Sequence, residues 1–116
     1  MKYLIFFTIF LFGFSSQKEY VYRVKQINIY EGFRVVIAEN NKEPRTLICT
    51  NPSLIIQTGK CYSIYTLDKY EYYKEAYNIE FSISDVGLSS WTSESGITIK
   101  SENGSEILFI KSLKQR

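Results

Sequence analysis

The sequence predicts a mainly β protein, a small antiparallel barrel of five to seven strands with one short helix, which follows a cleaved signal peptide. Three observations predict this fold class. Most of the chain after Gln17 alternates apolar and polar side chains, which is the period of strands that bury one face. Gly, Asn and Pro interrupt the alternation at turn-like positions. The 116 residues also contain one short segment with helical spacing, and they suffice for one domain but not for two.

Residues 1–15 have the layout of a secretory signal peptide. Lys2 gives a positive start, an almost unbroken apolar run of eleven residues follows, and Gly13 and Ser15 supply small side chains before the cut. A membrane-spanning helix needs about 20 apolar residues, so this run is too short to be one. A short buried core helix is the alternative, but the five Phe of this run would lie on every face of such a helix. We therefore expect residues 16–116 to form one exported domain, periplasmic or secreted, with no stable membrane span in the mature form.

Three strands are expected in the first part of this domain. In the first strand the alternation of apolar and polar side chains shifts by one position after Val24. Such a shift is typical of a β-bulge that bends a strand. The second strand is rich in β-branched side chains and is expected to be central in the sheet. The three strands form an antiparallel meander. They cover residues 20–29, 33–38 and 45–50, with turns at residues 30–32 and 40–44.

A fourth strand and a helix are expected next. The strand covers residues 61–67, after a connection that is apolar enough to pack on the core. Asp68 and Glu71 then match a helix N-cap followed three residues later by an acid. Aromatic and small side chains recur at helical spacing, so we expect a short helix over residues 69–77. Four Tyr within this segment make a strand the alternative.

In the last third of the domain, the sequence predicts a strand, a loop and a hairpin. Residues 79–83 alternate apolar and polar side chains, which predicts a short strand. Residues 84–96 are rich in Ser and Gly, contain Trp91, and are typical of a long surface loop, a kind of segment that is often functional. Asn103-Gly104 is the dipeptide most typical of hairpins. The hairpin strands would cover residues 97–99 and 107–110, and a basic tail would follow.

These elements together fit a small barrel of the oligonucleotide/oligosaccharide-binding (OB) type, with one strand more than the simplest version needs. Three segments of the sequence read Tyr22-Arg23-Val24-Lys25-Gln26-Ile27, Phe33-Arg34-Val35-Val36-Ile37-Ala38 and Gly59-Lys60-Cys61-Tyr62-Ser63-Ile64. With these motifs the chain resembles small exported bacterial proteins that carry no assigned function. The resemblance covers roughly residues 20–67 and rests on framework residues. It therefore implies the fold and the export, and no chemistry.

The two cysteines, Cys49 and Cys61, are expected to form a disulfide. Outside the cytosol an even number of Cys suggests a bridge. Cys49 ends the third expected strand and Cys61 begins the fourth. If these strands are neighbours, the two side chains come near the distance that a disulfide requires. Two buried free thiols are the alternative.

The inventory of side chains argues against an enzyme. Without His, the chain has no Ser-His-Asp or Cys-His relay and no His-ligated zinc site. It also lacks a phosphate-binding loop, a dinucleotide fingerprint and the spacing of an EF-hand. Glu71 and Glu75 have the spacing of paired carboxylates on a helix, but their neighbours Lys69 and Lys74 indicate a solvated charged face. No Ser-Lys pair is distinguished from any other. We expect no catalytic residues, no cofactor and no metal site.

The charge balance argues against nucleic acid as a partner. Removal of residues 1–15 leaves 13 basic and 12 acidic side chains, which are interleaved along the chain. An OB barrel that binds nucleic acid needs a basic groove with stacking aromatic rings. Export also takes the protein away from most nucleic acid.

The remaining indication of function is the high content of aromatic residues. The mature chain keeps nine Tyr, three Phe and one Trp. The Tyr residues of segment 70–77 are too dense for all of them to be buried on one helix face, and Tyr and Trp are favoured at interfaces. We therefore expect a non-catalytic binding module for a protein or glycan of the cell envelope. The alternative is a structural or stress-tolerance envelope protein without a specific ligand. The expected contact residues are Tyr70, Tyr72, Tyr73 and Trp91.

Overall fold

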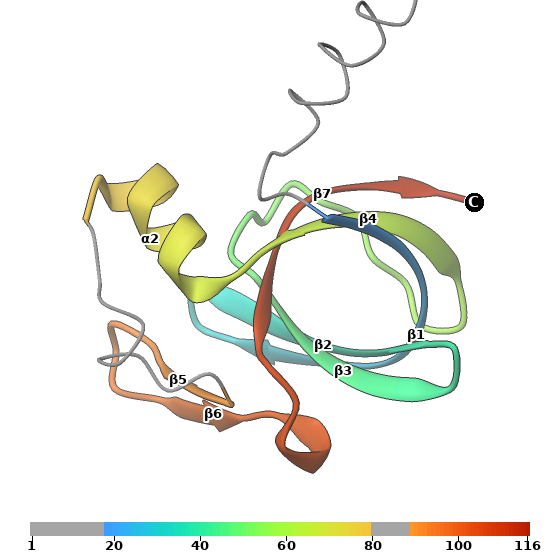
Figure 1. Ribbon diagram of the computed structural model, residues 1–116, viewed down its shortest axis with the longest axis horizontal. Coiled ribbons are helices and arrows are strands. Elements are labelled where there is room, and N and C mark those ends of the chain that lie inside the picture. The colour runs from blue at the N-terminus through green and yellow to red at the C-terminus, as the bar shows by residue number, and fades with distance from the viewer. Residues whose placement is uncertain (1–17, 80–88) are drawn as a thin grey trace, which may run out of the picture.

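The computed structural model describes residues 18–79 and 89–116, and shows a β-barrel with a helix and a small sheet at its side (Figure 1). The expected signal peptide, residues 1–15, lies outside the described residues. The prediction of a mainly β barrel with one α-helix is confirmed for the described part of the chain. The elements are β1 (Lys18–Tyr30), β2 (Phe33–Asn40), β3 (Glu43–Cys49), β4 (Cys61–Leu67), α2 (Lys69–Tyr77), β5 (Ser90–Thr92), β6 (Thr98–Lys100), the 3-10 turn η2 (Glu102–Gly104) and β7 (Leu108–Gln115).

Five strands close the barrel in the order β1-β2-β3-β7-β4, and β4 pairs back to β1. The first three strands form the predicted antiparallel meander. β4 then lies on the other side of β1, which gives the spatial order of a Greek key. β7 closes the barrel between β3 and β4, antiparallel to β4 but parallel to β3. The contact between β3 and β7 is therefore an exception to the antiparallel pairing that the sequence predicts.

β1 is bent, as the slip in its apolar phase predicts. Its first part pairs with β4 and its second part with β2, and its register against β2 shifts between Val24 and Gln26. The shift is a β-bulge next to Arg23, the residue that lies opposite both Cys61 of β4 and Glu39 of β2. A bulge increases the local twist of a strand. Here it coincides with the point where β1 changes from one neighbour to the other.

The interior of the barrel is filled by side chains from all five of its strands. Tyr22 and Tyr62 are the largest of them, and both are buried. The Tyr62 hydroxyl accepts a hydrogen bond from the Gln57 N–H at 2.8 Å, which ties the connection between β3 and β4 to this core. The other buried members are Val24, Val36, Ala38, Leu47, Cys49, Ile56, Ile64 and Ile110.

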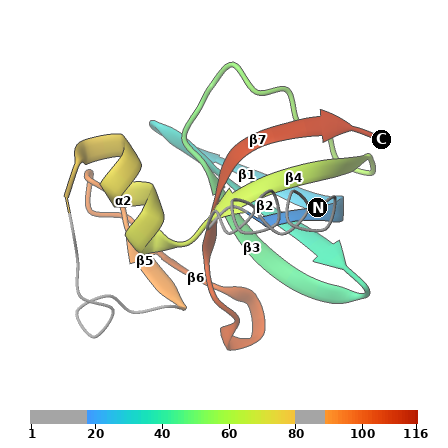
Figure 2. The ribbon, with the colours of Figure 1, turned by 45° about the horizontal axis from the view of Figure 1, so that its top comes forward.

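A second apolar core lies outside the barrel, on the side where α2, β5 and β6 lie (Figure 2). Successive strand residues point to opposite faces, so Val36 and Leu47 fill the barrel while Val35 and Ile48 lie in the second core. Both faces of β2 are therefore buried, which explains its weak alternation. The buried members of the second core are Phe33, Val35, Ile48, Trp91, Ile99, Ile107 and Phe109.

The expectation of a disulfide is wrong, because Cys49 and Cys61 are both free. Their strands follow one another along the chain but are not neighbours in the barrel. Cys49 of β3 lies opposite Arg34 of β2, whereas Cys61 of β4 lies opposite Arg23 of β1. Cys49 is buried in the barrel interior and Cys61 is exposed.

The expected C-terminal hairpin is also wrong. β6 pairs with β5, with Ile99 opposite Trp91, and β7 joins the barrel instead. Asn103-Gly104 lies in η2, where both residues have positive φ but connect strands of different sheets. The dipeptide thus marks a turn correctly, while the pairing partners of the flanking strands are set by contacts distant in sequence.

The expected surface loop over residues 84–96 is corrected within its described part. Residues 90–92 form β5, and Trp91 is buried in the second core with 8% of its surface exposed. Residues 84–88 lie outside the described residues. So do residues 80–83 of the strand expected over residues 79–83.

Candidate binding cleft

A hollow of about 480 Å³ lies between α2, the turn that joins β1 to β2, and the connection between β5 and β6. We call it the aromatic cleft, because five of its lining residues are aromatic. This volume is within the range of ordinary ligand sites, about 300–1,000 Å³. Its described lining consists of Glu31, Gly32, Phe33, Thr50, Tyr72, Tyr73, Tyr77, Trp91, Ser93, Glu94 and Ser95.

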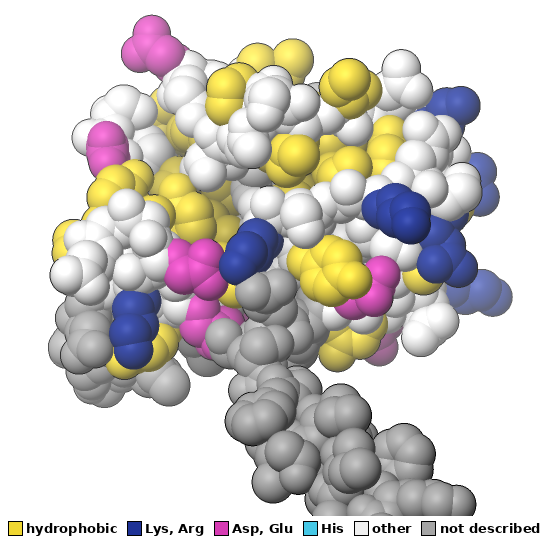
Figure 3. All heavy atoms as spheres, turned by 90° about the horizontal axis from the view of Figure 1, so that it is seen from above, with side chains coloured by type: hydrophobic (Ala, Val, Ile, Leu, Met, Phe, Trp, Pro, Cys, Tyr) yellow, Lys and Arg dark blue, Asp and Glu magenta, His cyan; other side chains and the backbone are white. Residues whose placement is uncertain are grey.

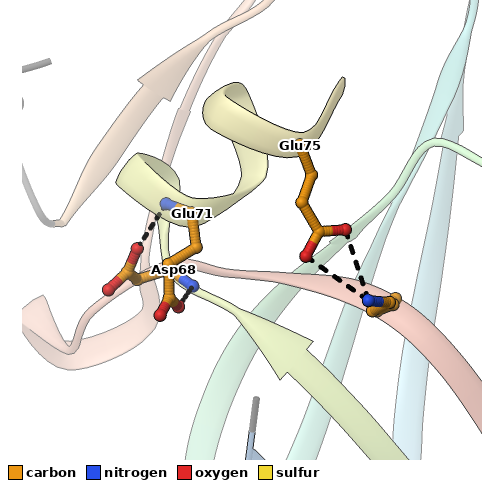
Figure 4. Close-up of polar contacts among 4 residues, drawn as sticks. Asp68, Glu71 and Glu75 are labelled. Atoms are coloured by element: carbon orange, nitrogen blue, oxygen red, sulfur yellow. Dashed lines mark hydrogen bonds and ion pairs between the residues drawn. The ribbon is translucent and has the colours of Figure 1, made fainter. Parts of the chain in front are cut away.

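Helix α2 supplies three of these rings, and both of its ends are fixed. The Asp68 carboxylate accepts from the Glu71 N–H at 2.8 Å, and the Glu71 carboxylate accepts from the Asp68 N–H at 3.1 Å (Figure 4). This is the predicted capping box, and the predicted helix over residues 69–77 is confirmed. Asn78 ends the helix in the left-handed conformation, and its N–H donates to Lys74 O at 3.0 Å.

The helix is also held against the barrel by charge. Glu75 forms an ion pair with Lys111 of β7 at 3.3 Å (Figure 4). Since Glu71 belongs to the cap and Glu75 to this ion pair, the two carboxylates have separate structural partners. They do not form a pair for acid–base chemistry.

Tyr72 lines the aromatic cleft from α2. Its ring stacks on Phe109, with centroids 4.1 Å apart and planes at 9°. Its hydroxyl donates to Thr50 Oγ1 at 3.2 Å, which connects α2 to the end of β3. One face of this ring is thus buried against the second core. Tyr72 is therefore half-buried.

Trp91 lines the cleft from β5. Its Nε1–H donates to the Tyr73 hydroxyl at 2.7 Å, so β5 and α2 are joined across the cleft by a direct hydrogen bond. The indole lies edge-on to Phe33 and to Phe109, with centroids 5.0 Å and 5.5 Å apart. Such edge-to-face pairs have favourable quadrupole geometry. The walls of the cleft are therefore held in place without a ligand.

Tyr77 stands at the outer edge of the cleft and is 46% exposed. Its ring stacks on Tyr73 with centroids 5.6 Å apart and lies edge-on to Tyr72. Desolvation raises the pKa of its phenol to about 12, with further contributions from Tyr72 and from the Glu94 carboxylate, both of which are hydrogen-bonded to it. Glu94 thus lies next to the aromatic rings.

A second hollow of about 360 Å³ adjoins the aromatic cleft, because the two share Gly32, Phe33 and Thr50 in their linings. Its remaining walls are mainly apolar, and Ile29 beside it is 79% exposed. Arg34 secures one side, since its Nη2 donates to the carbonyls of Asn51 and Leu54 at 3.0 Å and 2.8 Å. The rest of its lining is Ile29, Tyr30, Arg34, Cys49 and Pro52.

Three of the four contact residues expected from the sequence are brought together here, namely Tyr72, Tyr73 and Trp91. Tyr70 also lies on α2 but is not among the residues that line the cleft. The residues that the sequence analysis missed are Tyr77, Phe33, Glu31 and Glu94. Tyr77 could have been found, because it follows Tyr73 by four residues and shares its helix face. Glu31 and Glu94 carry no local signal, since turns and loops bring them to the cleft.

Within residues 18–79 and 89–116, no group of three or more Asp, Glu, Cys or His side chains is arranged to hold a metal ion. None of the helices in this part of the chain is long and apolar enough to cross a membrane.

No protein-family model, curated protein or solved structure matches this chain. The function is therefore inferred from the geometry and charge of the cleft.

Proposed function

We propose that this protein is a non-catalytic binding module for another protein of the cell envelope, and that a segment of that partner lies in the aromatic cleft. The observation that carries the proposal is a hollow of ligand size whose aromatic walls are fixed in advance. Trp91, Tyr73 and Tyr72 are held by hydrogen bonds to one another or to β3. Preorganised walls lower the entropy that binding costs.

The ring geometry favours a protein over a glycan as the occupant. A sugar ring stacks on an open aromatic face, but the ring of Tyr72 already stacks on Phe109, and Trp91 is 8% exposed. The adjoining hollow of about 360 Å³, which has mainly apolar walls, extends the site beyond the aromatic cleft. Aromatic side chains and pockets of this kind are typical of the central part of protein interfaces.

Selection of a phage-displayed random peptide library on the purified protein tests this proposal. The informative variant is Tyr77→Ala, which removes the outer wall of the cleft and introduces a good helix former. Tyr20→Ala is the matched control, because Tyr20 is 43% exposed, compared with 46% for Tyr77, and also contacts another Tyr ring, Tyr22. Tyr20 lies on β1 and does not line the cleft.

Selected peptides should bind the wild type and Tyr20→Ala equally, and Tyr77→Ala at least tenfold more weakly. Equal binding to Tyr77→Ala would exclude the cleft as the site. Failure to select any peptide would favour the alternative of a structural or stress-tolerance protein without a ligand. Envelope oligosaccharides that bind in a manner sensitive to Tyr77→Ala would replace the protein partner with a glycan.

We further infer that the barrel is of the OB type and that the protein is exported, as its resemblance to small exported bacterial proteins implies. A five-stranded Greek-key barrel supports the OB assignment. The layout of residues 1–15 supports the export. Mass spectrometry of protein recovered from outside the cytosol should show an N-terminus at Ser16, and a chain beginning at Met1 would contradict the export.

A further inference from the structure

We infer that the partner presents a cationic side chain, a lysine ammonium or an arginine guanidinium, to the aromatic cleft. This inference rests on the proposed function and specifies the chemistry of the occupant. Two features of the cleft support it independently, namely the charge of its lining and the arrangement of its rings.

The charge of the lining is negative. Glu31 enters it from the turn between β1 and β2, and Glu94 from the connection between β5 and β6. None of the described lining residues is Lys or Arg, and the sequence contains no His. A basic side chain in the cleft would find two carboxylates and no described cation. An acidic one would be repelled by the same two carboxylates.

Tyr77 is the most exposed of the five rings in the described lining, at 46%. Tyr72 lies at 80° to Tyr73 and at 81° to Tyr77, and Phe33 lies at 89° to Trp91. Aromatic faces attract ammonium and guanidinium groups through the ring quadrupole. The apolar stem of a Lys or Arg suits the same walls.

The raised pKa of the Tyr77 phenol is consistent with this negative charge. Desolvation, and then the neighbouring Tyr72 and Glu94 groups, raise the pKa of its phenol to about 12, which means that a negative charge is disfavoured at that position. The Glu94 carboxylate that disfavours the phenolate favours a positive charge placed beside the ring.

The face of the molecule shown in Figure 3 has an uneven distribution of charge. The Lys and Arg side chains visible in Figure 3 gather mainly toward the end of the barrel where β7 ends, while most of the Asp and Glu side chains lie toward α2. Such an asymmetric charge distribution steers charged partners by the sign of their charge. The exposed basic residues of the barrel end come from β1, the residue before β4, and β7, and they are Arg23, Lys25, Lys60, Lys114 and Arg116.

A pair of small probes tests this inference directly. Nα-acetyl-lysine methylamide and its neutral counterpart Nα-acetyl-norleucine methylamide differ mainly in the ammonium group. Each is titrated against the full protein, with the fluorescence of Trp91 as the readout, since Trp91 is the single Trp of the chain. The variants are Glu94→Gln, which keeps a hydrogen-bond acceptor for Tyr77, and Glu31→Gln. Glu43→Gln is the control, because Glu43 is exposed at the turn between β2 and β3 and does not line the cleft.

The lysine probe should bind at least fivefold more tightly than the norleucine probe. Glu94→Gln and Glu31→Gln should each remove a large part of this preference, and Glu43→Gln should leave it unchanged. Equal affinities of the two probes would overturn the inference, as would a preference that survives in the Glu31→Gln/Glu94→Gln double variant. If neither probe binds while peptides from the library still bind in a Tyr77-dependent manner, the cationic occupant is wrong and the proposed function stands. If the peptides also fail to depend on Tyr77, the proposed function itself fails.

Discussion

The indole N–H of Trp91 donates to the hydroxyl of Tyr73 at 2.7 Å, and this bond joins β5 to α2 over a separation of 18 residues in sequence. Both groups lie at the edge of the second core, and both line the aromatic cleft. The same contact thus stabilises the packing of the small sheet on the helix and fixes two walls of the candidate site. Stability and site geometry are coupled at this position.

Replacement of Tyr73 by Phe should lower the free energy of unfolding by about 1–3 kcal/mol, because the buried Trp91 N–H loses its acceptor. Urea denaturation with Trp91 fluorescence measures the change. Tyr70→Phe is the control, since Tyr70 is also partly buried on the same helix but does not line the cleft. Equal stabilities of the two variants would show that the bond contributes nothing.

Under native conditions one thiol per chain should react rapidly with Ellman's reagent. Cys61 is exposed at the start of β4, whereas Cys49 is 1% exposed in the barrel interior. Cys49 should react only after the barrel unfolds. Absence of both thiols in denaturant without a reductant would mean that the chain carries a disulfide, contrary to the arrangement of β3 and β4.

Replacement of Arg34 by Met should destabilise the protein by about 1.5–3 kcal/mol, the range for hydrogen bonds made by a charged group. Its guanidinium donates to the carbonyls of Asn51 and Leu54 and to Cys49 Sγ, and so holds the start of the connection between β3 and β4. Thermal or chemical denaturation measures the loss. Arg23→Met, a change at an exposed position of β1, provides the comparison and should have a much smaller effect.

The Tyr77 phenol should titrate with a pKa of about 12 in the folded protein, above its ordinary value of 10.0. Because the folded state then holds this proton more tightly than the unfolded state does, the contribution of Tyr77 to stability is complete below pH 10. It is lost as the pH rises from 10 toward 12. The ¹³Cζ chemical shift of Tyr77 measures the midpoint. In the Tyr77→Phe variant stability should fall less steeply over this range, and a midpoint near 10 would refute the assignment.

Local patterns in the sequence predict the local parts of this fold. The phase slip after Val24 identifies the bulge of β1, and Asp68 with Glu71 identifies the capped start of α2. Both depend on residues only a few positions apart. The apolar run of β2 likewise indicates a central strand, although its burial on two faces becomes clear only with the second core in place.

The predictions that the structure contradicts concern contacts between segments that are distant in sequence. The order of strands along the chain suggests a disulfide, but β7 lies between β3 and β4 in the barrel. Asn103-Gly104 indicates a turn and carries no information about which strands its flanks join. For the same reason the aromatic residues of the cleft are predictable as a group on α2, while Glu31 and Glu94 are placed there by the tertiary fold alone.

The indole N–H signal of Trp91 provides the most direct test of the central claim that the aromatic cleft is the binding site. The chain has a single Trp, so this signal is unique in a ¹⁵N–¹H spectrum, and its proton lies in the bond to Tyr73. During titration with a peptide selected on the protein, the signal should shift progressively until it saturates. The dissociation constant fitted to this shift should equal the one measured independently for that peptide. A peptide that binds with the same constant while the Trp91 signal stays in place would contradict the account.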